Sequence, residues 1–322
     1  MIRREPAGEP RHPDDRDAIG LGRRRGSRAA APVAPERTGR PVAKNPRRAP
    51  RAAARAIAAA AATLLAACTV HSAGVRGLST ADCPLLIAHR GYTGNAHGTG
   101  PVPANSAAAI ANAAGHGATV VEFDVRWSAD DIPVIIHNAT VNATTRRRGK
   151  VANYKAVTLE KMRLRSSSGV TSAYLPSLAR MLRQVVREHV KAVIQIKTNG
   201  ITAAQAASLT AAIDSAAAQR AVSIHSFYPA SLAALAAYPA TLLTETPVTA
   251  APGDVGVDLR GSIVTPALVA RLHAAGLTVG AWTSPGSGVR DDKATWARLA
   301  ADGVDRIITN GTAAYVRWCG RV

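Results

Sequence analysis

The sequence predicts an α/β protein whose folded part is a single (β/α)8 TIM barrel. From about residue 84 onward, short β-branched runs alternate with Ala/Leu-rich stretches, which indicates βα units and a parallel sheet. Eight such units in about 235 residues fit a (β/α)8 barrel, for which about 250 residues are typical. The turn after the first strand, HRGYTG at 89–94, lacks the glycine pattern of a dinucleotide-binding open sheet. The barrel is therefore favoured over a doubly wound sheet.

Each barrel element is predicted from its local pattern. The strands are expected at 85–89, 119–125, 192–197, 221–226, 240–244, 256–259, 278–283 and 306–309, with a short run at 133–137 pairing beside the second strand. The helices are expected at 106–116, 175–189, 203–217, 230–237, 266–275 and 292–301. Ser106, and Thr265 ahead of Pro266, are typical helix-start residues. Gly276 follows a predicted helix end, where a C-cap glycine belongs.

The charge of the chain is concentrated near its N-terminus and does not indicate a nucleic-acid partner. The formal net charge is +19, and the first 55 residues alone hold fifteen Lys/Arg and six Asp/Glu residues. The remaining excess is spread thinly, with no aromatic-spaced basic cluster, finger or recognition-helix pattern. We therefore expect no nucleic-acid partner, although a basic excess would still attract anionic substrates and membranes.

The N-terminal segment predicts an exported protein. Residues 1–55 are rich in Arg, Pro, Gly and Ala without apolar periodicity, as in a disordered segment. Residues 56–73 begin with an apolar run of thirteen residues, too short for a bilayer, which takes about 20. The basic flank and the small residues at its end match a secretory signal peptide. A linker at 74–83 would then lead into the barrel domain at 84–322.

The end of this apolar run also predicts a lipid anchor. The tetrapeptide LAAC at 65–68 resembles a bacterial lipobox, in which cleavage precedes a lipidated cysteine, here Cys68. The alternative is an ordinary signal peptide that is cut near Ala73. We favour lipidation, which would tether the protein to the outer face of the membrane without spanning it. The alternative predicts a freely secreted protein.

The other two cysteines, Cys83 and Cys319, flank the whole predicted barrel. In an exported protein such a pair predicts a disulfide that closes the two ends of the domain. The alternative is two unrelated buried thiols. No Cys-x-x-Cys or Cys/His zinc spacing is present.

Polar side chains gather at the predicted C-terminal ends of the strands, where barrel enzymes place their active sites. They are His89 and Arg90 after the first strand, Glu122 and Asp124 on the second, His137 after the short run, and Lys197 after the third. Glu122 and Asp124 lie two apart, so both side chains point to one face of their strand. Facing the barrel interior, an uncompensated carboxylate pair would be costly, and a divalent cation is the simplest remedy.

These residue types suit the cleavage of a phosphodiester. A hard cation on the two carboxylates would neutralise phosphate charge, Arg90 and Lys197 could hold non-bridging oxygens, and the two histidines could share proton transfer. Each residue alone has a plainer explanation, such as a strand-end histidine that caps a carbonyl or a solvent-exposed lysine. Only the combination favours catalysis.

Several short motifs follow one another along the predicted barrel. The most distinctive are IAHRG at 87–91, PANS at 103–106, VEFDV at 121–125 and PVIIHN at 133–138. Weaker ones follow at IQIK (194–197), AWT (281–283) and GVDRIITN (303–310). In order and spacing these motifs resemble the glycerophosphodiester phosphodiesterase family over residues 85–316.

The resemblance implies a metal-dependent enzyme in a TIM barrel. It would hydrolyse a glycerophosphodiester to an alcohol and glycerol 3-phosphate with a bound Ca²⁺ or Mg²⁺. The roles it implies are acid/base catalysis for His89 and His137, metal binding for Glu122, Asp124 and Gln195, phosphate contacts for Arg90 and Lys197, and a substrate wall for Trp282. The expected partner is a small glycerophosphodiester or a lipid headgroup, and we expect a monomer.

Three positions depart from the family pattern. Ala104, Asn138 and Gln195 stand where the family usually has acidic residues. Gln195 keeps a carbonyl oxygen for a hard cation but removes one negative charge, so metal binding should be weaker. Asn138 cannot balance a positive imidazolium. Two alternatives therefore stay open: a barrel that binds phosphodiesters or headgroups without efficient turnover, and a phospholipase-D-like lipid hydrolase.

Overall fold

The computed structural model describes residues 83–248, 256–283 and 288–320. The predictions for residues 1–55, for the signal peptide at 56–73 with Cys68, and for most of the linker lie outside these residues. Within the described ranges, every helix is too short or too polar to cross a bilayer.

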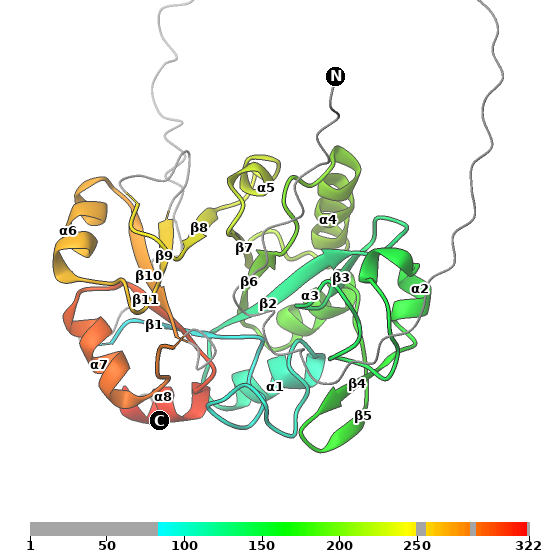
Figure 1. Ribbon diagram of the computed structural model, residues 1–322, viewed down its shortest axis with the longest axis horizontal. Helices are drawn as coiled ribbons and strands as arrows, with labels where there is room; N and C mark the ends of the chain where they lie inside the picture. The colour runs from blue at the N-terminus through cyan, green and yellow to red at the C-terminus, as the bar shows by residue number, and fades with distance from the viewer. Residues whose placement is uncertain (1–82, 249–255, 284–287, 321–322) are drawn as a thin grey trace, which may run out of the picture. The chain divides into compact units, whose positions relative to one another are not determined.

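Eight parallel strands form a closed ring, which confirms the predicted TIM barrel (Figure 1). Around the ring the strands are β1 (Leu85–Ala88), β2 (Val120–Trp127), β6 (Lys191–Ile196), β7 (Val222–Ser226), β8 (Ala240–Thr244), β9 (Gly256–Arg260), β10 (Thr278–Trp282) and β11 (Arg306–Thr309). The pairing of β1 with both β11 and β2 closes the ring. Each strand lies within two residues of its predicted position, because the β-branched runs mark the strands directly.

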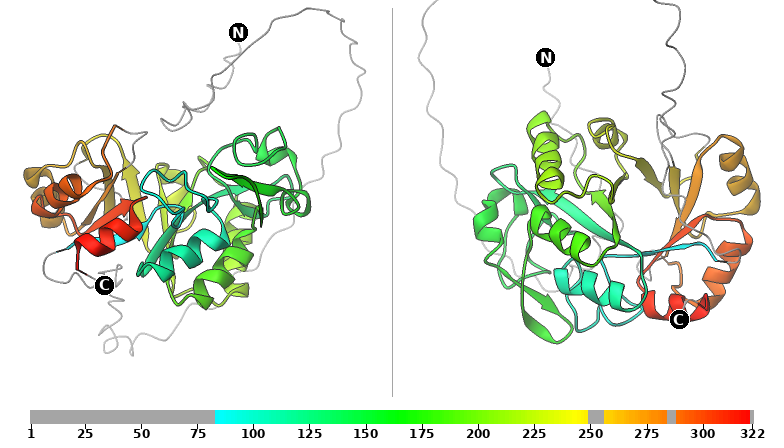
Figure 2. Two further views of the ribbon diagram at one scale, coloured as in Figure 1. Left: turned by 90° about the horizontal axis from the view of Figure 1, so that it is seen from below. Right: turned by 180° about the vertical axis from the view of Figure 1, so that it is seen from behind.

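The helices lie outside the ring of strands, as both views in Figure 2 show. They are α1 (Ala107–Gly115), α3 (Leu178–Arg187), α4 (Ala203–Ser215), α5 (Pro229–Ala233), α6 (Pro266–Ala274), α7 (Lys293–Ala301) and α8 (Thr312–Trp318). Ser106 and Thr265 cap α1 and α6 through their side chains, as predicted. Helix α8 was not predicted, because it has seven residues and no side-chain cap on Gly311 to mark its start.

A small insertion between β3 (Pro133–Ile135) and α3 is the main addition to the predicted fold. Strand β3 pairs antiparallel with β2, as expected. The insertion then forms the short helix α2 (Ala156–Leu159) and a hairpin of β4 (Arg163–Ser166) and β5 (Gly169–Tyr174). Its separate apolar core is built from Val134, Ile136, Val141, Val151, Ala156, Leu159, Met162, Leu164 and Leu175.

The two faces of each barrel strand bury different side chains. Leu86 and Ala88 of β1 join the large core between strands and helices, whereas Leu85 and Ile87 join a smaller cluster with residues of other barrel strands. This alternation follows from the two-residue period of a strand. The smaller cluster corresponds to the side chains that fill a barrel interior.

A disulfide joins Cys83 to Cys319 across 236 residues of sequence, with a Cα–Cα distance of 6.0 Å. The predicted disulfide is thereby confirmed. Near it, the Tyr315 hydroxyl donates a hydrogen bond of 2.9 Å to the Pro84 carbonyl. The last helix is thus fastened to the start of the first strand.

Candidate active site

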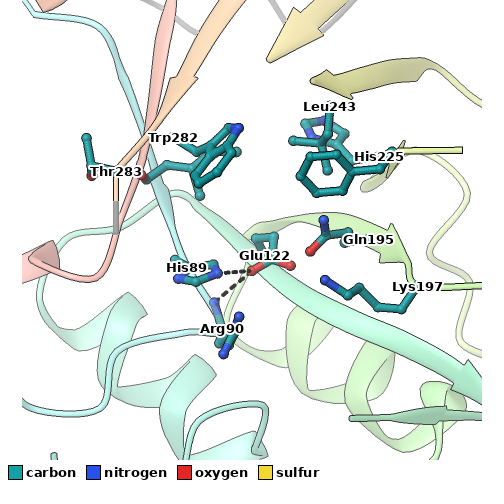
Figure 3. A pocket seen from close by; sticks show the side chains of 11 residues that line it. His89, Arg90, Glu122, Gln195, Lys197, His225, Leu243, Trp282 and Thr283 are labelled. Carbon is teal, nitrogen blue, oxygen red and sulfur yellow. Dashed lines mark hydrogen bonds and ion pairs between the residues drawn. The ribbon is translucent and has the colours of Figure 1, made fainter. Parts of the chain in front are cut away.

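A pocket lies at the C-terminal ends of the barrel strands and collects six of the predicted site residues (Figure 3). Its lining consists of His89, Arg90, Glu122, Gln195, Lys197, His225, Phe227, Leu243, Trp282, Thr283 and Ile308. Asp124 and His137 do not line it and are buried. The predicted residues therefore form two groups: six line the pocket, and Asp124 and His137 are buried outside its lining.

The turn that follows β1 depends on two residues with positive φ. Arg90 has φ 55° and Gly91 has φ 74°. A Cβ on Gly91 would lie 2.6 Å from the backbone carbon of Ala109 in α1, so only glycine fits between turn and helix. The turn aims the Arg90 backbone N–H at Glu122 Oε2, 2.9 Å away. The His-Arg-Gly motif thus orients a carboxylate as well as supplying two side chains.

Asp124 is surrounded by groups that stabilise its negative charge. Its Oδ2 accepts a hydrogen bond of 2.8 Å from Asn105 Nδ2 and lies 3.1 Å from Arg90 Nε. Lys197 Nζ lies 3.8 Å from Oδ1. Burial alone would raise the pKa of Asp124, but the positive charges of Arg90 and Lys197 hold that pKa well below its usual range. Asp124 is therefore ionised and holds the two cationic side chains in place.

Asn105 was missed as a site residue, although it stands in the PANS motif. It adopts φ 58°, and its Oδ1 accepts a 3.0 Å hydrogen bond from the Asp124 backbone N–H. Its amide therefore bonds both the backbone and the side chain of Asp124. The sequence did carry a signal for this role, because asparagine is a short polar residue that tolerates the left-handed backbone region.

The negative charge of Glu122 is balanced by far fewer neighbouring groups than that of Asp124. Its Oε2 accepts the Arg90 backbone N–H and lies 3.9 Å from His89 Nε2, while its Oε1 is buried without a hydrogen-bond partner. Burial, and then the charge of Asp124, raise the pKa of Glu122 to about 8. A buried carboxylate in this state takes up either a proton or a cation.

The donors around Glu122 fit a hard cation. Figure 3 shows the Gln195 side-chain amide beside the Glu122 carboxylate, and carboxylate and amide oxygens are ligands that Ca²⁺ and Mg²⁺ accept. Among the described residues, no group of three His, Cys, Asp or Glu side chains is placed to hold a metal. That result agrees with Gln195 standing where the family pattern has an acid.

His89 is oriented by residues from β11 and beyond. Its Nδ1 lies 2.8 Å from Asn310 Oδ1, and because an amide oxygen only accepts, Nδ1 carries the proton. Asp291 in turn accepts the Asn310 backbone N–H at 2.7 Å. Nε2 is then the ring nitrogen directed toward Glu122. Asp291 was missed, since it lies in a segment without a motif; Asn310 stands in a quoted motif but was assigned no role.

His137 is held in its neutral form. Its Nδ1 lies 2.6 Å from Asn138 Oδ1, and Arg126 Nε donates to the His137 carbonyl at 2.7 Å. Burial, followed by the charges of Arg90 and Lys197, holds the pKa of His137 well below 6.5. A neutral Asn138 does little to oppose this effect.

A second polar cluster inside the barrel was not predicted. His225 Nδ1 lies 2.9 Å from Asp258 Oδ2, and Arg306 Nη2 lies 2.7 Å from Asp258 Oδ1, all three side chains being buried. Gly280 makes room for this cluster, because a Cβ there would lie 1.9 Å from Asp258 Oδ1. The available signal was a charged residue in the middle of an otherwise apolar strand.

The opposite wall of the pocket is apolar. Trp282 and Phe227 meet edge to face with ring centroids 6.2 Å apart, and Leu243 and Ile308 complete the wall. The pocket therefore presents a cationic and acidic side to a phosphate and an apolar side to an organic group.

The sequence model of the glycerophosphoryl diester phosphodiesterase family matches residues 89–314. The chain belongs to this family. It is 33% identical over 102 residues to human glycerophosphodiester phosphodiesterase 1, covering 32% of this chain and 29% of the human protein. The rat protein of the same name gives 32% over 111 residues, covering 34% and 32%. The aligned stretch thus spans about a third of the length of these relatives.

Solved structures of similar proteins share the barrel. A phosphodiesterase from Oleispira antarctica, in complex with the product sn-glycerol-3-phosphate, gives a TM-score of 0.63 at 20% identity, covering 74% of this chain and 98% of that chain. A glycerophosphodiester phosphodiesterase from Agrobacterium tumefaciens str. C58 gives a TM-score of 0.59 at 21% identity, covering 73% and 99%.

Proposed function

We propose that this protein hydrolyses glycerophosphodiesters to an alcohol and glycerol 3-phosphate with the help of a divalent cation. The observation that carries the proposal is the buried, undercompensated Glu122 in a pocket that also holds His89, Arg90 and Lys197. Family membership supports the same reaction, and so does the product found in the Oleispira antarctica structure.

The cation, Ca²⁺ or Mg²⁺, would be held by Glu122 and Gln195, which line the pocket, and by Oδ1 of the buried Asp124, which accepts no hydrogen bond from the described residues. It would supply positive charge to the phosphate and would lower the pKa of the attacking hydroxyl. Arg90 and Lys197 then bind non-bridging oxygens, because Asp124 already holds both side chains near the pocket floor. Trp282 and Phe227 pack against the organic part of the substrate.

The two histidines move protons in opposite directions. His89 lines the pocket with its proton fixed on Nδ1, so its Nε2 accepts the proton of the attacking hydroxyl. His137 is the proposed acid: in its protonated form it gives a proton to the leaving alcohol oxygen and becomes neutral. Because its pKa is held low, only a small share of the molecules carries that proton at neutral pH.

Export remains part of the proposal. The Cys83–Cys319 disulfide agrees with an oxidising compartment. Lipidation of Cys68 would place the enzyme on the outer face of the membrane, and cleavage near Ala73 would release it. The monomeric state also stays a prediction.

Release of glycerol 3-phosphate from glycerophosphocholine tests the reaction. We expect release with Ca²⁺, Mg²⁺ or Mn²⁺, and a loss of about 10² to 10⁴ in rate for His89→Ala or His137→Ala. His116→Ala is the matched control, because His116 is an exposed histidine outside the pocket. Full activity in both site variants would overturn the assigned roles.

One specific observation favours a second function, the binding of phosphodiesters without efficient turnover. Asn138 and Gln195 each lack the charge that would support proton donation and metal binding. Saturable binding of glycerophosphocholine with no release under any of the three metals would establish this alternative.

A further inference from the structure

A second cationic concavity lies outside the reaction pocket, on the insertion between β3 and α3. It is a groove of about 360 Å³ that is lined by Asn142, Thr145, Arg146, Arg147, Arg148, Arg165, Gly169 and Val170. Half of these residues are arginines, and all four arginine side chains are exposed. Three come from one loop and the fourth comes from β4.

The loop that carries three of these arginines is fixed by its own hydrogen bonds. Val141 N–H donates to the Gly149 carbonyl at 3.0 Å, and Gly149 N–H donates to Asn142 Oδ1 at 2.8 Å. Arg165 N–H bonds the Thr144 carbonyl at 2.9 Å and so joins the loop to the hairpin. Because the separate apolar core lies under both segments, the groove is formed before any ligand binds.

The positive charge of the groove is not balanced by acidic side chains of the insertion. Residues 138–176 contain eight Lys/Arg residues and a single acid, Glu160, whose Oε1 accepts hydrogen bonds from Ser177. Within the described residues, none of the four groove arginines forms an ion pair. Clustered like charges repel one another, and a bound anion relieves that repulsion.

The hairpin that carries Arg165 touches the loop that leads from His89 and Arg90 to α1. Ser167 N–H, at the turn between β4 and β5, donates to the Gly100 carbonyl at 3.3 Å. In the same loop, Gly98 lies against Asn310, the residue that bonds His89. Figures 1 and 2 show the hairpin next to this loop.

We propose that this groove is a binding site for a phosphate group distinct from the one that enters the barrel pocket. Guanidinium groups match phosphate oxygens in charge and in fork geometry, and four of them can hold more than one phosphate oxygen pair. The ligand is either a soluble molecule that carries several phosphates or the anionic headgroups of a lipid surface. Binding at this groove does not require that the barrel catalyse hydrolysis.

The test compares the full chain with Arg147→Ser/Arg165→Ser and with the matched control Arg183→Ser/Arg187→Ser. The control removes two exposed arginines from α3, so both variants have the same net charge and the same N-terminal segment. Tripolyphosphate is the soluble probe, and phosphatidylglycerol vesicles, with phosphatidylcholine vesicles as blank, are the lipid probe. We expect the groove variant to lose affinity by about tenfold or more, and the control to change little.

Each outcome decides the proposal. Selective loss of tripolyphosphate binding supports it and assigns a soluble ligand, and selective loss of vesicle binding supports it and assigns a lipid surface. Equal binding of both probes by the groove variant and the control overturns it. Should the first variant fail to unfold cooperatively, Arg146→Ser/Arg148→Ser replaces it. Glycerophosphocholine has one phosphate, so its hydrolysis tests the proposed reaction independently of the groove.

Discussion

Asp258 and Glu122 are both buried carboxylates on barrel strands, but the protein compensates them differently. The two oxygens of Asp258 meet Arg306 at 2.7 Å and His225 at 2.9 Å. Burial raises the pKa of Asp258, and the two partners more than reverse that effect. Glu122 meets a backbone N–H and a histidine at 3.9 Å, and burial raises its pKa to about 8.

The difference separates a carboxylate that is balanced within the fold from one that is left unbalanced at a pocket. Asp258 has Arg306 as its counter-charge and His225 beside it inside the fold, so it needs no ligand from outside. Glu122 lines the open pocket and needs a proton or a cation to satisfy its buried Oε1. Strongly shifted pKa values next to a cleft are typical of functional sites.

Removal of the Arg306 guanidinium beside Asp258 should give the largest change in the free energy of unfolding. Arg306→Met leaves Asp258 buried with only His225 beside it, so we expect the free energy of unfolding to fall by about 3–5 kcal/mol. Urea unfolding measures this change. Arg180→Met, an exposed residue of α3, is the control and should cost less than about 0.5 kcal/mol. Similar losses in the two variants would contradict a paired structural centre.

Neutralising Glu122 should raise the free energy of unfolding of the metal-free protein, whereas Arg306→Met lowers it. The folded protein binds a proton on Glu122 between its ordinary pKa of 4.5 and about 8, where the unfolded chain has released it. The stability of metal-free protein therefore falls as pH rises through this window. Glu122→Gln removes that dependence and should stabilise the metal-free fold at pH 9 by up to about 5 kcal/mol.

Urea unfolding in chelator at pH 6 and pH 9 measures this effect. Asp124→Asn is the contrasting variant, because the pKa of Asp124 is held low and its loss leaves Arg90 and Lys197 without their counter-charge. It should destabilise the protein at both pH values. A pH profile that is the same in wild type and Glu122→Gln would show that Glu122 is ordinarily ionised.

Gln195→Glu should change the affinity for a divalent cation, and this effect should be smaller than the two effects on stability. The substitution adds a second negative oxygen donor beside Glu122, so affinity for Mg²⁺ or Ca²⁺ should rise by about tenfold. Calorimetric titration with each metal measures it. Gln219→Glu, on the exposed surface, adds the same charge elsewhere and should leave the affinity unchanged. Equal affinities in all three proteins would place Gln195 outside the metal's coordination shell.

The sequence predicted the barrel well because its signal is local and repeated. Each strand is a short β-branched run, and Ser106 and Thr265 mark helix starts. The β4–β5 hairpin was not predicted, since Leu164 is the only buried residue of β4 and gives no clear alternation.

The candidate site was predicted as a set of residues but not as an arrangement. The motifs located His89 and Lys197 just past the ends of their strands and Glu122 within β2, and all three line the pocket. The motifs could not show that the Asp124 side chain lies next to Arg90 and Lys197. That contact depends on which side chains of neighbouring strands point into the barrel. The His225 cluster depends on three strands that are distant in sequence, so no local pattern reveals it.

Proton release on metal binding tests the central claim most directly. Titration of wild-type protein with Mg²⁺ or Ca²⁺ at pH 7, in two buffers of different ionisation enthalpy, measures the protons displaced. A cation at Glu122 should release about one proton per metal bound, because the pKa of that carboxyl lies above the pH of the titration. Glu122→Gln should release none and bind more weakly. Metal binding without proton release, or unchanged in Glu122→Gln, would contradict the assignment of Glu122 as the carboxylate that the cation completes.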